Sequence, residues 1–160
     1  SYDWGGIDDS KKLSVEQRAR LSARIRQDAA TGLGIATAAE IDASNVLEAS
    51  LRAMERAVAK LTHAPDHILV DGNRLPDWAH AAEAAIGGDA RAPSIAAASI
   101  IAKHARDEMM VSLDEQYPGY HWAQNKGYGV PAHREGLEAQ GVSPEHRRTF
   151  APIRRLLEQS

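Results

Sequence analysis

Two aspartates, Asp71 and Asp89, stand where regular structure is expected to break. Asp71 closes the apolar run of residues 67–70 and is followed by a Gly-Asn pair. We predict a short buried strand that delivers this carboxylate to the edge of an α/β sheet, where such sheets bind ligands. Asp89 follows two glycines and precedes an alanine-rich helix that Pro93 is suited to open. Two carboxylates delivered in this way are the beginning of a site for a hard divalent cation.

Four basic residues complete a set suited to phosphodiester chemistry: Lys11, Arg91, Lys103 and Lys126. Bound metal ions stabilise the attacking and leaving oxygens of such a reaction, while cations hold the phosphate backbone. The residues alone leave plainer interpretations open. An Asp-Gly pair after a strand also makes a simple turn, and Ser10 with Lys11 also suits a solvated loop. Lys103 is spaced to pair with Asp107 on one helix face.

The composition narrows the class of protein. A chain of 160 residues with 43% hydrophobic and 26% charged residues fits one soluble globular domain. It has no cysteine, which excludes disulfides and thiol chemistry and agrees with a cytoplasmic location. The histidines lack zinc-ligand spacing, and no apolar run is long enough to span a membrane. Because the net charge is -3, binding to nucleic acid requires a local basic patch.

The remaining patterns predict mostly helices. Ser14 and Gln17 form a possible capping box at the start of a first helix. Residues 47–61 carry an apolar stripe, read as core, and residues 131–140 form a helix closed by Gly141. A last amphipathic helix covers about residues 153–157.

Two further strands and a turn complete the expected elements. Small and apolar residues alternate over residues 32–38, which predicts a strand, and residues 83–86 form a possible short one. Residues 40–45 are expected to be a polar turn.

Six segments, in this order, closely resemble bacterial ribonuclease HII. They are Asp9-Ser10-Lys11-Lys12-Leu13-Ser14, Glu40-Ile41-Asp42-Ala43-Ser44-Asn45, Val70-Asp71-Gly72-Asn73, Ser94 to Lys103 with Arg106-Asp107, Lys126-Gly127-Tyr128, and His146-Arg147-Arg148-Thr149-Phe150. Each segment alone is unspecific, but six in register cover nearly the whole chain from Asp9 onward.

The resemblance implies a fold and an activity. The fold is α/β, a ribonuclease-H-like mixed sheet flanked by helices, in a single domain with a helical part from about residue 116. The activity is endonucleolytic, metal-dependent cleavage of the RNA strand in RNA–DNA hybrids and of single ribonucleotides embedded in duplex DNA. The products implied are a 5′-phosphate and a 3′-hydroxyl, the cofactor Mn²⁺ or Mg²⁺, and the full-length protein a monomer.

The resemblance also assigns residues. It makes Asp71 and Asp89 catalytic, metal-binding carboxylates, and it places Tyr128 beside the RNA–DNA junction. Three further residues are expected to contact the substrate: Ser10, Lys11 and Lys103. Asp107 is interpreted as a structural pairing partner.

The chain departs from the family pattern in one respect that matters for activity. Family members begin with a strand carrying Asp-Glu, followed by a Gly-Arg-Gly segment, and neither precedes Asp9 here. The usual lysine before the Gly-Asp turn is Gly87. We therefore expect an N-terminally incomplete enzyme that lacks the first strands of the sheet and is inactive, or nearly so, by itself. The alternative function is a non-catalytic module that binds RNA–DNA hybrid or duplex with steep salt dependence and no need for Mg²⁺.

Overall fold

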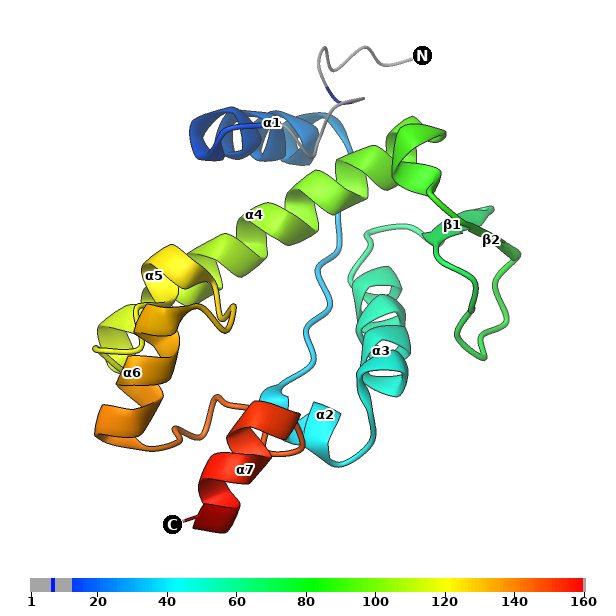
Figure 1. The fold of residues 1–160 in the computed structure, drawn as a ribbon. Coiled ribbons are helices and arrows are strands. Elements are labelled where there is room, and N and C mark those ends of the chain that lie inside the picture. Colours follow the sequence, from blue (N-terminus) through cyan, green and yellow to red (C-terminus); the bar gives the residue numbers. More distant parts are fainter. Residues whose placement is uncertain (1–6, 8–12, 160) are drawn as a thin grey trace. The chain divides into compact units, whose positions relative to one another are not determined.

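The computed structural model describes Ile7 and residues 13–159, and it groups the chain into two compact units (Figure 1). The first unit comprises Ser1–Ile35 with Ser50–His104, and the second comprises Ala36–Ala49 with Ala105–Ser160. The predicted single domain, with a helical part from about residue 116, is not decided by this grouping and stays a prediction.

The elements follow one another in the order α1 (Val15–Asp28), α2 (Ala38–Asp42), α3 (Val46–Ala59), β1 (Ile68–Asp71), β2 (Ala82–Ala85), the 3₁₀ helix η2 (Gly88–Ala90), α4 (Pro93–Gln116), α5 (Trp122–Asn125), α6 (Pro131–Gln140) and α7 (Ala151–Gln159). The chain passes between the two units at three places, after Ile35, within α3 and within α4. Among the residues described, no helix is long and apolar enough to cross a lipid bilayer.

The first unit contains a small parallel sheet. Strand β1 pairs with β2 in a register that runs from Ile68 opposite Ala82 to Asp71 opposite Ala85. The strand that ends at Asp71 is therefore confirmed, and the second strand begins one residue earlier than predicted. Residues 72–81 join the two strands without a helix.

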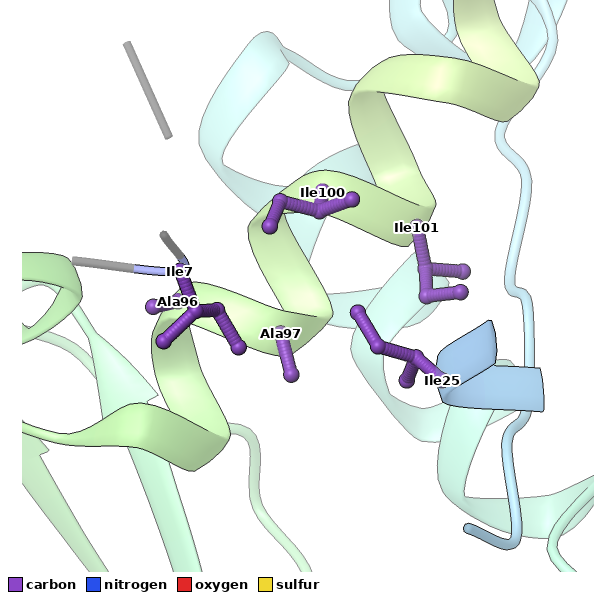
Figure 2. Close-up of a cluster of buried hydrophobic side chains, with 6 residues drawn as sticks. All are labelled: Ile7, Ile25, Ala96, Ala97, Ile100 and Ile101. Carbon is purple, nitrogen blue, oxygen red and sulfur yellow. The ribbon is translucent and has the colours of Figure 1, made fainter. Parts of the chain in front are cut away.

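Helix α1 packs on α4 in the core of this unit. The predicted capping box is present, because the Ser14 hydroxyl accepts from the Gln17 N–H at 3.2 Å and the Gln17 side chain accepts from the Ser14 N–H at 2.8 Å. Figure 2 shows Ile25 of α1 beside Ala97 and Ile101 of α4. The buried cluster consists of Ile7, Ile25, Ala96, Ala97, Ile100 and Ile101. The alanines leave room for the two helices to approach closely.

The strand predicted over residues 32–38 is wrong. Residues 30–37 have no regular structure, and they lie along α3 instead of pairing with another strand. A Cβ atom on Gly34 would lie 1.7 Å from the carbonyl oxygen of Ala53, so the backbone touches the helix. The carbonyl of Ile35 accepts a hydrogen bond from Arg56 Nη1 at 2.6 Å. The alternation of small residues therefore reflects contact with a helix.

Helix α3 forms as predicted, although its apolar stripe is not fully buried. Only Ala49 of this helix is buried, and Leu47 is 44% exposed. The last residue of the predicted stripe, Leu61, lies beyond the helix end at Ala59.

The second unit is helical and has its own core. Tyr120 and Trp122 stack with ring centroids 4.9 Å apart, and the rings of the buried His133 and His146 stack at 5.3 Å. The apolar part of this core is Met110, Tyr120, Trp122, Leu137 and Ile153. Helix α6 has the predicted bounds, and its C-cap Gly141 adopts a φ of 78°.

Two short helices of this unit, α7 and α2, differ from the elements predicted at their positions. Helix α7 confirms the last amphipathic helix and extends it at both ends. A polar turn was predicted over residues 40–45. Residues 40–42 instead belong to the short helix α2, which the capping box of Thr37 and Glu40 begins, and residues 43–44 form the turn.

Candidate active site

Asp71 is exposed at the end of β1, and its carboxylate is tied to the segment that carries Asp89. Oδ1 of Asp71 accepts a hydrogen bond from the backbone N–H of Gly88 at 3.0 Å. Its other oxygen, Oδ2, has no hydrogen bond or ion pair with any residue that the structure describes. One oxygen therefore fixes the orientation of the carboxylate while the second is available to a ligand.

Asp89 is the half-buried central residue of η2 and follows Gly88 directly in the chain. The Gly88 N–H bond therefore places the backbone of Asp89 next to the Asp71 carboxylate. The two glycines before Asp89 are favoured for different reasons, backbone conformation at Gly87 and limited space at Gly88. Gly87 adopts a φ of 66°, in the left-handed region that favours glycine. A Cβ atom on Gly88 would lie 2.3 Å from Cδ1 of Ile95, so the Ile95 side chain would have to shift to admit one.

The donor set suits a hard divalent cation, because Mg²⁺ and Mn²⁺ prefer carboxylate oxygens. Within Ile7 and residues 13–159, no group of three or more histidine, aspartate or glutamate side chains is placed to hold a metal ion. Asp71 and Asp89 fit part of a coordination shell, and the rest of such a shell would come from water, substrate phosphate oxygens or other carboxylates.

Helix α4 carries two further sequence-predicted residues, Lys103 and Asp107. The side chain of Lys103 is exposed, in the part of the helix that belongs to the first unit. Asp107 belongs to the second unit and is only 8% exposed, which suits the structural role expected of it. Its backbone carbonyl accepts a hydrogen bond from Lys126 Nζ at 3.5 Å.

Tyr128 belongs to the second unit, on a loop that Asn125 organises. The buried Asn125 donates through Nδ2 to the carbonyl of Tyr120 at 2.7 Å and accepts through Oδ1 from the Gly127 N–H at 2.8 Å. Lys126 and Gly127 both take positive φ, at 52° and 83°, which turns the chain sharply. The loop leaves the Tyr128 side chain 70% exposed. The ring is therefore exposed to solvent, on a loop whose backbone is fixed by the hydrogen bonds of Asn125.

Sequence reasoning missed Asn125. Its position directly before Lys-Gly was a usable signal, because asparagine side chains commonly bond to the backbone two residues further on in tight turns. Ser10 and Lys11, which were predicted to contact phosphates, lie outside the described residues.

A family model for ribonuclease HII matches residues 4–153. The chain belongs to the ribonuclease HII family. It is 58% identical over 148 residues to the ribonuclease HII of Rhizorhabdus wittichii, an alignment that covers 92% of this chain and 73% of that relative. It is 49% identical over 156 residues to the ribonuclease HII of Thiobacillus denitrificans, covering 97% and 76% of the two chains.

A solved structure agrees with this assignment. The ribonuclease H2 from Pyrococcus horikoshii OT3 superimposes with a TM-score of 0.78 at 25% identity, over 96% of this chain and 81% of that one. The predicted family, α/β fold class and enzyme class are confirmed. Ribonucleases HII are ribonucleases H that act on RNA–DNA hybrids and generally depend on divalent metal ions. The metal ligands and the products of cleavage stay predictions.

Proposed function

We propose that this chain carries two metal-binding carboxylates, Asp71 and Asp89, of an endonuclease that cleaves the RNA strand of RNA–DNA hybrids. The proposal extends to single ribonucleotides embedded in duplex DNA and to products with a 5′-phosphate and a 3′-hydroxyl. The observation that supports it is the Gly88 N–H bond to Asp71 Oδ1, which joins the two acid-bearing segments.

The carboxylates of Asp71 and Asp89 act by holding negative charge at a fixed position. Mn²⁺ or Mg²⁺, when bound, lowers the pKa of a water molecule and neutralises charge that develops on the phosphate. Asp71 offers Oδ2 to such an ion, while the Gly88 N–H prevents the side chain from turning away. Asp89 adds a second negative charge from the adjoining 3₁₀ helix.

Substrate contacts are proposed to come from four residues: Ser10, Lys11, Lys103 and Tyr128. The cationic side chains suit backbone phosphates, and the exposed ring of Tyr128 suits stacking on a sugar or base beside the RNA–DNA junction. The bonds of Asn125 to the loop backbone reduce the entropy lost when the ring stacks.

A cleavage assay on a labelled RNA–DNA hybrid in Mn²⁺ tests the catalytic assignment. Two carboxylates are too few to hold two divalent ions. We therefore expect the 160-residue chain to cut slowly or not at all alone, and to cut when fused to an upstream Asp-Glu/Gly-Arg-Gly segment from a relative.

In the active fusion, Asp71→Asn should lower the cleavage rate by about a hundredfold or more, because a carboxamide is a much poorer ligand for a hard cation. Asp66→Asn removes the same charge from an exposed loop before β1 and serves as the matched control. Full activity of the Asp71 variant would overturn the assignment. Hybrid binding that is steeply salt-dependent, indifferent to metal and never followed by cleavage would favour the binding module.

A further inference from the structure

An exposed basic turn of the second unit lies far from Asp71 in the sequence and has no role in the proposed chemistry. It consists of residues 147–150, Arg-Arg-Thr-Phe, and is called the basic corner. It directly precedes α7, and Asp42 at the end of α2 contacts it across 107 residues of sequence.

The carboxylate of Asp42 accepts three hydrogen bonds from the basic corner. Oδ2 accepts from the Arg148 N–H at 2.7 Å, and Oδ1 accepts from the Thr149 N–H at 2.9 Å and from the Thr149 hydroxyl at 2.6 Å. Burial raises the pKa of Asp42, but the bonds from Thr149 and Arg148 and the charge of Arg147 outweigh it and lower the pKa below its usual value. The carboxylate is therefore charged at neutral pH, and both of its oxygens are hydrogen-bonded to the basic corner.

The position of Asp42 at the C-terminal end of α2 indicates that its carboxylate serves to fix the basic corner. A carboxylate in the last turn of a helix is unfavourable, because it lies beside the negative end of the helix dipole. Both oxygens go to backbone N–H groups and a hydroxyl, so they fix the path of the main chain at Arg148 and Thr149.

Arg147 and Arg148 carry the positive charge of this turn, and Arg147 is half-buried. Arg148 is exposed, and its guanidinium makes no ion pair with any residue that the structure describes. The guanidinium carbon of Arg147 lies 5.0 Å from the centre of the Phe150 ring, which holds it by a cation–π contact. Planar guanidinium groups held in this way match the geometry of phosphate oxygens.

We propose that the basic corner binds backbone phosphates of the nucleic-acid substrate and that Asp42 is its positioning residue. This inference rests on the proposed function, because it takes the RNA–DNA hybrid as the partner. The chain has a net charge of -3, so attraction to a polyanion must come from local clusters of cations. The corner supplies two adjacent cations on a main chain that Asp42 holds through hydrogen bonds to two backbone N–H groups.

Binding of a labelled RNA–DNA hybrid to the 160-residue chain in EDTA, measured over a range of KCl concentrations, tests the corner. Arg148→Ala should raise Kd by about threefold to tenfold and reduce the slope of log K against log salt by about 0.9, the loss of one phosphate contact. Arg52→Ala removes an equal charge from the exposed face of α3 and should leave both quantities unchanged. An Arg148 variant that binds like the parent chain would overturn the inference and leave the proposed function standing.

Asp42→Asn separates positioning from simple electrostatics. Removing a negative charge beside two arginines should tighten binding to a polyanion if charge alone matters. If Asp42 positions the corner, the Asp42→Asn variant binds the hybrid more weakly than the parent chain. In an Arg148→Ala background the same change causes no further loss of affinity, because both changes act through the same contact. Tighter binding, or full additivity of the two changes, would overturn the role of Asp42.

The controls separate the possible failures. Far-UV circular dichroism establishes that each variant is folded, and Arg148→Glu, a surface change, gives a second measure of the corner that does not involve Asp42. If the parent chain fails to bind the hybrid even at low salt, the proposed function and this inference both fail.

Discussion

At the scale of single residues, the candidate site depends on backbone conformations that few residue types accept. Asp71 keeps its orientation because the Gly88 N–H reaches Oδ1, and Gly88 is brought there by the left-handed conformation of Gly87. In the proposed site this orientation matters for catalysis, because a carboxylate that turns away no longer offers its oxygen as a metal ligand.

Gly87→Ala should therefore weaken both stability and catalysis. No atom lies within 4 Å of the added Cβ, so the cost is only the strain of φ at 66°, about 1 kcal/mol. Chemical denaturation should show this loss, and the active fusion should cleave more slowly if the turn relaxes. Gly129→Ala is the matched stability control, since its Cβ also meets no atom and its φ is not in the left-handed region. Equal stability of the two variants would contradict the strain argument.

At the scale of elements, close contact between a loop and a helix replaces an expected strand. Residues 30–37 lie along α3 through glycines. Arg56 of α3 donates a hydrogen bond to the carbonyl of Ile35, and Lys60, just beyond the helix end, donates one to the carbonyl of Leu33. Two loop carbonyls thus find donors without a neighbouring strand.

Gly34→Ala tests this contact. The added Cβ would meet the Ala53 carbonyl oxygen at 1.7 Å, and backbone must shift to relieve it. We expect a loss of about 1–3 kcal/mol in the free energy of unfolding, measured by urea denaturation against the Gly129→Ala control. A variant as stable as the control would show that the loop does not pack on α3 in solution.

At the scale of the whole molecule, the second unit has two buried imidazoles in its aromatic core. Burial, with a smaller effect of the nearby His133, lowers the pKa of His146 to about 4. Nε2 of His146 has no hydrogen-bond partner in the described part of the chain. The folded unit therefore accepts a proton at this ring less readily than the unfolded chain does.

Acid should consequently destabilise this unit over a defined range. Above the ordinary histidine pKa of about 6.5 both states are neutral and stability is at its full value. As pH falls toward 4 only the unfolded state takes the proton, and stability falls by up to about 3 kcal/mol before it levels off. Thermal unfolding followed by tryptophan fluorescence at pH 7 and pH 5 measures the change. His146→Phe keeps the ring and should show a smaller difference, whereas equal differences would contradict the assignment.

The sequence by itself determined the features that a few neighbouring residues control. The strand ending at Asp71, the capping box at Ser14 and the helix from Pro131 to Gly141 could all be predicted, because caps, breakers and apolar runs act over one or two turns. The six-segment resemblance found the family. Its assignment of Asp71 and Asp89 as the metal-binding acids stays a prediction.

Only the tertiary structure decided which distant segments meet. It showed that residues 30–37 lie along α3 instead of pairing in a sheet, and that the Gly88 N–H holds Asp71. It also joined Asp42 to Arg148 and Thr149. The physical reason is that a hydrogen bond or a close backbone contact depends on how the chain returns in space, and local residue patterns carry no information about that path.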